Sequence, residues 1–170
     1  MILHTVSLMG MATRMTKRPV APHRLLFVCL GNICRSPTAH GVFRAKARAA
    51  GLKVVTDCAG TGGWHIGQPP DRRAMQAAAA RGYDLSDLRP RQIKPADFAR
   101  HDLILVMDRS NLKDVEALRP KGDITPVRLF SDGTAAGGRD IPDPYYTDGF
   151  DQVLDLIETC ADDLLRRLRP

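Results

Sequence analysis

A short apolar run followed at once by a loop of small and polar residues constrains this chain more than any other feature. Residues Leu25–Val28 are all apolar, which predicts a strand buried on both faces of a sheet. The loop at residues 29–36 follows, and a helical stretch begins near Pro37. In parallel α/β sheets, ligands bind beyond the carboxyl ends of the strands. The loop at residues 29–36 is therefore the first place to look for a site.

The alternation of strand-like and helix-like segments continues along the chain. The pattern predicts strands at 25–28, 52–58, 103–106 and 124–129, and helices at 37–50, 71–81, 108–118 and 147–168. Apolar strands that alternate with helices are typical of an α/β fold with right-handed crossovers. We therefore predict one domain over residues 24–170, with a central parallel sheet of about four strands and helices on both faces.

Composition limits the classes of partner. The formal net charge of +6 favours anionic partners, but the basic residues are spread along the chain. Nucleic-acid binding needs a clustered basic surface, so no nucleic-acid partner is predicted. No apolar run approaches the roughly 20 residues that a membrane helix needs. The four cysteines match neither a disulfide framework nor a metal motif, which favours reduced thiols in a cytoplasmic protein. No cluster of His, Asp and Glu has the spacing of metal ligands, so no metal or cofactor is expected. We expect a monomer or weak dimer.

The first 23 residues differ from the rest of the chain. They contain three basic residues and no acid, and their apolar part precedes the basic residues, which is the reverse of a secretory signal. We expect residues 1–23 to be an N-terminal extension, either disordered or the product of a start codon assigned too early.

The loop at residues 29–36, here called the phosphate loop, has the composition of an anion site. A loop between a strand end and a helix start directs successive backbone N–H groups into one concavity, and the helix N-terminus adds partial positive charge. Arg35 can add two parallel hydrogen bonds to an oxyanion. Gly31 and Asn32 are residue types that tolerate the positive φ angles that we expect there.

Cys29 lies at the start of this loop and is the candidate nucleophile. Helix N-termini and nearby cations favour the thiolate form of a cysteine, and the hydroxyl of Ser36 can donate a hydrogen bond to the sulfur. A thiolate in an anion site can attack phosphorus and form a cysteinyl-phosphate that water then hydrolyses. The Cys-x5-Arg spacing is weak evidence by itself. Its position between a buried strand and a Ser-Pro helix start is more specific.

With these residues in view, the segment Val28–Pro37 resembles the phosphate-binding loop of the low-molecular-weight protein tyrosine phosphatases. The resemblance continues at residues 59–61, 64–67, 70–74, 106–108 and 143–146, and covers about residues 24–168. It implies hydrolysis of phosphotyrosine in proteins, with Cys29 as nucleophile, Arg35 as phosphate ligand and Asp143 as general acid and base. It also implies the substrate-binding residues Leu30, Gly31, Asn32, Ile33, Cys34, Ser36, Trp64, Tyr145 and Tyr146.

The mechanism requires an acid because a thiolate cannot protonate the leaving phenolate. Asp143 takes this role by resemblance, and Asp140 is the nearest competitor in the sequence. The aromatic residues Trp64, Tyr145 and Tyr146 are expected to form the walls that hold a flat phenyl ring. Cys34 resembles the family's second loop cysteine, which can trap an oxidised nucleophile as a disulfide; a small buried side chain is the alternative.

Three alternative functions compete with this interpretation. Arsenate reduction needs further cysteines in the middle of the chain, and residues 59–159 contain none. A protein-arginine phosphatase remains an alternative, although Ile33 and the Tyr145–Tyr146 pair favour tyrosine. A non-catalytic phosphopeptide-binding module is the third, although such a module normally lacks Cys29 or Asp143.

Two positions depart from the family pattern. Many members have serine at the position of Cys58, and some have histidine at the position of Arg81. We expect both side chains to lie in the layer that supports the phosphate loop.

Overall fold

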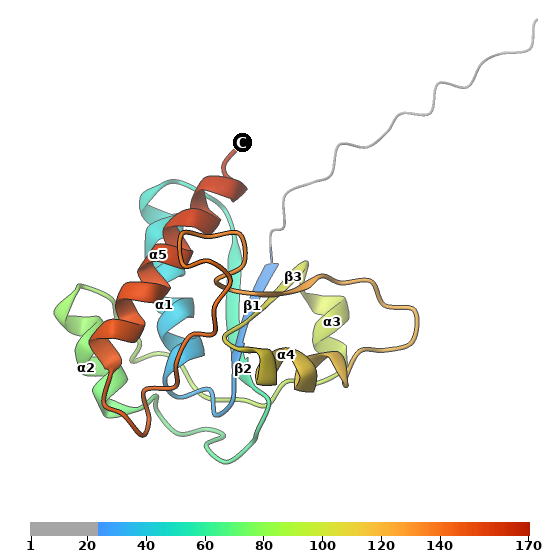
Figure 1. Ribbon diagram of the computed structural model, residues 1–170, viewed down its shortest axis with the longest axis horizontal. Helices are drawn as coiled ribbons and strands as arrows, with labels where there is room; N and C mark the ends of the chain where they lie inside the picture. Colours follow the sequence, from blue (N-terminus) through green and yellow to red (C-terminus); the bar gives the residue numbers. More distant parts are fainter. Residues whose placement is uncertain (1–23) are drawn as a thin grey trace, which may run out of the picture.

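The computed structural model describes residues 24–170 (Figure 1). The predicted N-terminal extension at residues 1–23 lies outside the described residues.

Four parallel strands form one sheet in the order β2-β1-β3-β4. They are β1 (Arg24–Cys29), β2 (Val55–Gly60), β3 (Leu103–Val106) and β4 (Val127–Leu129). The central strand β1 pairs with β2 from Arg24 opposite Val55 to Cys29 opposite Gly60, and with β3 on its other side. The predicted parallel sheet of about four strands is confirmed.

Helices cover both faces of this sheet (Figure 1). The helices are α1 (Arg35–Ala49), α2 (Arg72–Ala80), α3 (Ala96–Arg100), α4 (Arg109–Glu116) and α5 (Phe150–Leu168). Helices α1, α2 and α5 pack on one face, and α3 and α4 on the other. The predicted α/β architecture is confirmed, with the phosphate loop between β1 and α1.

Alternate residues of β1 point to opposite faces and supply two separate cores. Leu25 and Phe27 are fully buried against α1 and α5, and the Phe27 ring also contacts the rings of Phe43 and Phe130. Leu26 and Val28 are fully buried on the side of α3 and α4. Burial on both faces is why this strand is continuously apolar.

Local residue chemistry sets the helix ends. Gly51 follows the C-terminal end of α1, and its φ of 69° allows the next residue to donate a hydrogen bond back to Ala47. Pro37 lies in the first turn of α1, where its missing N–H removes no helical bond. The carboxylate of Asp71 caps α2 by accepting from the backbone N–H of Arg73 at 2.8 Å.

Three predicted elements had wrong boundaries, and one helix was not predicted. Strand β2 starts later than predicted and runs on to Gly60, which pairs with Cys29 although its neighbourhood reads as loop. The last strand begins at Val127, because the segment before it makes a turn in which Asp123 accepts from the Thr125 N–H. Helix α5 begins at Phe150, after Asp148 with its φ of 56°. Helix α3 was not predicted, because five residues are too few to show a helical period.

Within residues 24–170, no helix is both long enough and apolar enough to cross a bilayer.

Candidate active site

The phosphate loop turns sharply between β1 and α1, and Asn32 supplies the unusual backbone conformation. Asn32 has a φ of 56°, as predicted, whereas the prediction was wrong for Gly31, which does not have a positive φ. At Gly31 the absence of a side chain still matters, because a Cβ atom would lie 3.3 Å from the ring of His65. Gly60 permits a second close approach, because a Cβ there would lie 2.7 Å from the carbonyl oxygen of Leu30.

Cys29 lies at the base of the loop with polar groups directed at its sulfur. The Sγ atom lies 3.1 Å from Ser36 Oγ and accepts from the backbone N–H of Asn32 at 3.3 Å. Ser36 is also held by its neighbours: its Oγ accepts from Asn32 Nδ2 at 2.7 Å and lies 3.3 Å from the carbonyl oxygen of Ala59. These donors suit a thiolate, which needs hydrogen bonds to its charged form when it is buried.

Arg35 is buried, and groups from outside α1 hold its guanidinium. Its Nη1 donates to Asp108 Oδ2 at 2.7 Å and to the carbonyl oxygen of Ile141 at 2.9 Å. Its Nη2 lies 3.5 Å from Asp143 Oδ2. Burial lowers the pKa of Arg35, but the negative groups around it, with Cys29 foremost, raise that pKa by more. Arg35 therefore carries a fixed positive charge beside the thiol.

A pocket of about 370 Å³ opens above Cys29. Most of the predicted site residues line it, together with His65: they are Cys29, Leu30, Gly31, Ile33, Cys34, Arg35, Trp64, Asp143, Tyr145 and Tyr146. The exceptions are Asn32 and Ser36, which are 1% and 0% exposed and do not line the pocket. Both contact the sulfur of Cys29. The structure therefore brings together three segments that are separate in the sequence, at residues 29–35, 64–65 and 143–146.

The rim of the pocket is aromatic and exposed. Trp64 lies over Gly62, where a Cβ atom would fall 1.9 Å from the indole ring, so that glycine is needed for this packing. The rings of Tyr145 and Tyr146 pack edge to face with centroids 4.9 Å apart. Arg73 lies over the Tyr145 ring, 5.5 Å from its centroid. The three predicted aromatic residues thus surround the pocket mouth.

Asp143 faces Arg35 from a surface segment, residues 143–148, here called the acid loop. Its carboxylate accepts from the backbone N–H of Tyr145 at 3.1 Å. Arg73 ties the other end of this loop to α2, with hydrogen bonds to the Tyr145 carbonyl oxygen at 3.2 Å and to Asp148 at 2.5 Å. The competing candidate Asp140 pairs instead with Arg109 and does not line the pocket.

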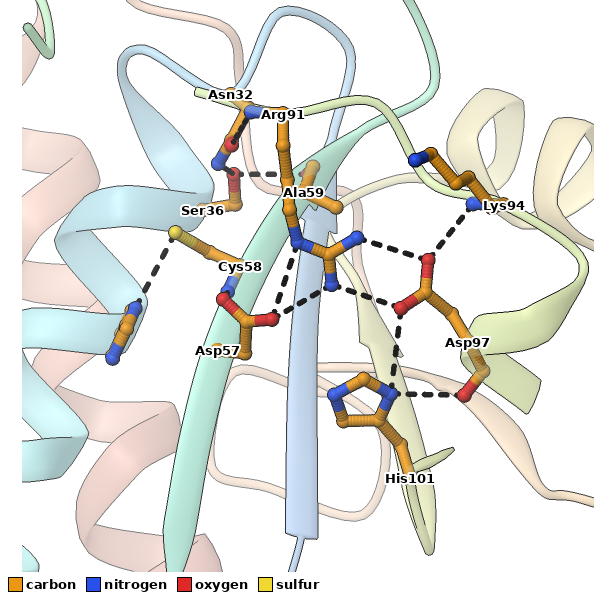
Figure 2. Close-up of polar contacts among 10 residues, drawn as sticks. Asn32, Ser36, Asp57, Cys58, Ala59, Arg91, Lys94, Asp97 and His101 are labelled. Carbon is orange, nitrogen blue, oxygen red and sulfur yellow. Dashed lines mark hydrogen bonds and ion pairs between the residues drawn. The ribbon is translucent and has the colours of Figure 1, made fainter. Parts of the chain in front are cut away.

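A layer of polar side chains lies behind the phosphate loop (Figure 2). Cys58 is part of it, as predicted, with its Sγ 3.4 Å from His40 Nδ1. Burial raises the pKa of Cys58 to about 12 and lowers the pKa of His40 to about 4, so both are neutral at pH 7. The prediction for Arg81 was wrong: it pairs on the surface with Asp155 and Glu158 of α5.

The same layer contains a group of side chains with the composition of a metal site. Ligand atoms of His40, Asp57 and Cys58 lie within 4.8 Å of one another. Both carboxylate oxygens of Asp57 are already engaged, one by the Cys58 N–H at 2.8 Å and one by the Arg91 guanidinium at 2.7 Å. A metal ion there would have to compete with a guanidinium for the carboxylate, so we assign no metal to this group.

Three residues near the site carry functional contacts that the sequence reasoning did not assign. Asp108 orients Arg35, His65 lines the pocket, and Arg91 donates its backbone N–H to Asn32 at 3.0 Å. Asp108 had a usable signal, because it follows a buried strand that neighbours β1. His65 lies in the segment at residues 64–67 that shares the family resemblance, which places it near the site without a role. Arg91 lies in a loop, and no local pattern distinguishes it.

Cys34 is buried beside the pocket, among Ile33, Ala74 and Phe150. Burial, followed by the negative charge of Asp71, raises the pKa of its thiol. Cys34 is therefore a protonated, weakly nucleophilic thiol, in contrast to the hydrogen-bonded Cys29. All four cysteines are free, and the predicted redox role of Cys34 stays a prediction.

Comparison with known proteins identifies the family. The family model described as low molecular weight phosphotyrosine protein phosphatase matches residues 24–170. The chain belongs to this family. A low molecular weight protein-tyrosine-phosphatase of Streptomyces coelicolor is 43% identical over 86% of this chain and 94% of its own length.

Solved structures of relatives agree with this membership of the low molecular weight phosphatase family. The crystal structure of YfkJ from Bacillus subtilis superposes with a TM-score of 0.81 at 36% identity, over 85% of this chain and 93% of that chain. Wzb of Vibrio vulnificus, solved in complex with benzylphosphonate, superposes with a TM-score of 0.77 at 28% identity, over 86% and 99% of the two chains.

Proposed function

We propose that this protein hydrolyses phosphotyrosine in proteins through a cysteinyl-phosphate intermediate. The observation that carries the proposal is the pocket in which Cys29 and Arg35 meet Asp143 from a distant segment. A nucleophile, a phosphate ligand and an acid on opposite sides of one cavity are the parts that phosphate monoester hydrolysis requires. The names of the relatives support the same activity.

In the first step the Cys29 thiolate attacks phosphorus and the bond from phosphorus to the phenolic oxygen breaks. Arg35 and the loop N–H groups bind the equatorial oxygens, on which charge is spread in the transition state. Asp143, protonated in this step, gives its proton to the leaving phenolate. The products of the step are an unphosphorylated tyrosine side chain and a phosphate group bound to the sulfur.

In the second step water attacks the cysteinyl-phosphate. The Asp143 carboxylate accepts a proton from that water, and the bond from sulfur to phosphorus breaks with its electron pair returning to Cys29. Ser36 Oγ, 3.1 Å from the sulfur, can stabilise the departing thiolate. Inorganic phosphate leaves, and the enzyme returns to its starting protonation state.

The pocket mouth favours an aromatic ester. Leu30 and Ile33 from the loop and the rings of Trp64 and Tyr145 provide apolar surface around the path to Cys29. A phenyl ring can fill this space while its phosphate reaches the loop. The relative solved with benzylphosphonate carries a ligand of the same kind, an aromatic group next to a phosphorus oxyanion.

We infer that the protein acts in the cytoplasm, as a monomer or weak dimer, on phosphotyrosine proteins and without nucleic acid. Four free thiols are usual in a reducing compartment. Many basic side chains are paired with acids on the surface, for example Arg44 with Asp87 and Arg119 with Glu116, which disfavours a phosphate-binding basic stripe. Residues 24–170 form the catalytic domain, and residues 1–23 precede it as an extension.

The test is phosphate release from phosphotyrosine and phosphoarginine peptides, without metal, by the wild type and by Cys29→Ser. Cys160→Ser is the matched control, because Cys160 is a buried thiol of α5 away from the pocket. We expect turnover of phosphotyrosine by the wild type and by Cys160→Ser, and none by Cys29→Ser, because a serine hydroxyl is a far weaker nucleophile at neutral pH.

Other outcomes would move the protein to another function. Preference for the phosphoarginine peptide would make it an arginine phosphatase. Tight binding of the phosphotyrosine peptide without phosphate release, by folded wild type, would make it a binding module.

A further inference from the structure

Asn32 connects the phosphate loop to the rest of the molecule. Its side-chain amide donates to Ser36 Oγ at 2.7 Å, and its backbone N–H donates to the sulfur of Cys29 at 3.3 Å. The residue is 1% exposed and its backbone has a positive φ, which asparagine tolerates better than most residues but which still costs it free energy relative to glycine. Something must therefore hold Asn32 in this conformation.

Asn32 has contacts from outside the loop with Cys58 of β2 and with the backbone of Arg91. The N–H of Arg91 donates to Asn32 Oδ1 at 3.0 Å, and the carbonyl oxygen of Arg91 accepts from the N–H of Gly60 at 2.8 Å. Gln92 forms a single parallel bridge to Gly60, outside any strand. The segment that carries Arg91 lies between α2 and α3, and further bonds hold the residues on either side of Arg91. The N–H of Ile93 donates to the Gly60 carbonyl oxygen at 2.8 Å, and the Pro90 carbonyl oxygen accepts from the N–H of Gly67 at 3.1 Å. The side chain of Arg91 adds a further restraint at its own position.

The guanidinium group of Arg91 restrains the position of this residue (Figure 2). It lies between two carboxylates from different elements. Asp57 of β2 accepts from Nε at 3.2 Å and from Nη2 at 2.7 Å. Asp97 of α3 accepts from Nη1 at 3.0 Å and from Nη2 at 2.9 Å. A planar fork of donors that meets two acids has a single orientation, which a lysine does not reproduce.

The two acids are themselves held in place. Asp97, with a side chain 3% exposed, also accepts from the backbone N–H of Lys94 at 2.8 Å. Asp57 accepts from the Cys58 N–H at 2.8 Å. The clamp thus joins β2, α3 and the segment around Arg91 into one unit, and the unit ends on Asn32.

We propose that Arg91, clamped by Asp57 and Asp97, is a positioning residue for the reaction at Cys29. Its guanidinium sets the place of its own backbone N–H, the N–H holds Asn32, and Asn32 holds Ser36 and the sulfur. This inference rests on the proposed function for its kinetic test, but the reactivity of Cys29 can be measured without any turnover.

The experiment compares Arg91→Met with Arg89→Met. Arg89 is the matched control, because it lies two residues earlier and its guanidinium donates to the carbonyl oxygens of Ser86 and Leu88, outside the clamp. We expect kcat on a phosphotyrosine peptide to fall about 10- to 100-fold in Arg91→Met, with a smaller change in KM, and to stay within twofold in Arg89→Met. The rate of alkylation of Cys29 by iodoacetate, assigned by mass spectrometry, should fall only in Arg91→Met.

A double-mutant cycle separates positioning from general support of the fold. If Arg91 acts through Asn32, then Arg91→Met in the background of Asn32→Ala should cause little further loss. Arg91→Lys keeps a charge for both acids if the methionine variant fails to fold, and we expect an intermediate loss of kcat from it.

Three results would overturn the proposal: equal losses in Arg89→Met, multiplicative losses with Asn32→Ala, or unchanged alkylation and kcat in folded Arg91→Met. If the wild type does not hydrolyse phosphotyrosine, the proposed function fails, while the alkylation rates still decide the role of Arg91.

Discussion

The two halves of the site, the phosphate loop and the acid loop, are built in opposite ways. In the phosphate loop, Asn32, Arg35 and Ser36 are at most 2% exposed, and contacts from β2, α4 and the segment around Arg91 hold them. In the acid loop, Tyr145 is 40% and Tyr146 86% exposed. Arg73, itself on the surface, ties that loop to α2.

This difference follows from what each half must do. Donors that stabilise a transition-state oxyanion work best when they are fixed before the substrate arrives, since no free energy is then spent on reorienting them. The phosphate group is the same in every substrate, so a rigid loop suits it. In the proposed function the acid loop would meet the peptide around the phosphotyrosine. The sequence of that peptide varies, and exposed aromatic side chains can accommodate the variation.

The largest expected effect in the acid loop comes from Asp143→Asn. The amide cannot protonate the leaving group, so kcat on a phosphotyrosine peptide should fall about 10²- to 10⁴-fold. The fall should be much smaller for p-nitrophenyl phosphate, whose leaving group needs less protonation. Comparing kcat for the two substrates checks this expectation.

Asp140→Asn is the matched control for that experiment. Asp140 precedes the acid loop and pairs with Arg109 at 2.8 Å, away from the pocket, so kcat should stay close to that of the wild type. An equal loss in both variants would mean that the acid is misassigned.

The two halves also differ in how far the sequence predicted them. Cys29 and Arg35 could be predicted locally, because a buried strand, a small-residue loop and a helix start stand next to one another in the chain. Asp143 required both the resemblance and the chemical need for an acid, since an Asp before a proline is usually a turn residue. Asp108 had a signal in its place after a buried strand, whereas the role of Arg91 depends on pairings between distant segments, which no local pattern encodes.

Errors in the fold have a similar physical origin. Gly60 reads as loop, yet it pairs with Cys29 as the last residue of β2, where the phosphate loop approaches too closely for a side chain. Arg81 was expected behind the loop, but the register of α2 directs it toward the acids of α5. Tertiary packing decided both positions, and a single sequence does not report it.

His40, in the layer behind the phosphate loop, makes the stability of the fold depend on pH. Burial, and then the nearby charge of Arg44, lower the pKa of His40 from 6.5 to about 4. Below pH 6.5 the unfolded chain binds a proton at His40 that the folded protein does not bind until about pH 4. His40 therefore stabilises the fold above pH 6.5, and this contribution is lost as the pH falls toward 4, by on the order of 3 kcal/mol.

Urea unfolding of the wild type and of His40→Gln at pH 7 and pH 4.5 measures this effect. We expect the wild type to lose more of its free energy of unfolding than the variant, because glutamine does not titrate. Other groups titrate in the same range in both proteins, so the difference between them isolates His40. Equal losses of unfolding free energy in the two proteins would show that folded His40 accepts a proton easily. The layer behind the phosphate loop would then be less rigid than we infer.

The smallest expected effect is that of Arg73→Met, which removes the tether of the acid loop. The hydrogen bonds of Arg73 to Asp148 and to the Tyr145 carbonyl oxygen are exposed to water, and exposed pairs contribute little. We expect kcat/KM for a phosphotyrosine peptide to fall only about two- to fivefold. Arg72→Met, one residue earlier on the surface of α2, is the control and should change kcat/KM less.

A loss above about 100-fold in Arg73→Met would contradict the comparison, because an acid held only loosely should tolerate a looser tether. The acid loop would then need the same fixed geometry as the phosphate loop. Tolerance of peptide sequence would in that case have to come from the side chains of Tyr145, Tyr146 and Trp64 alone. Substituting these side chains should then change the preference among peptides.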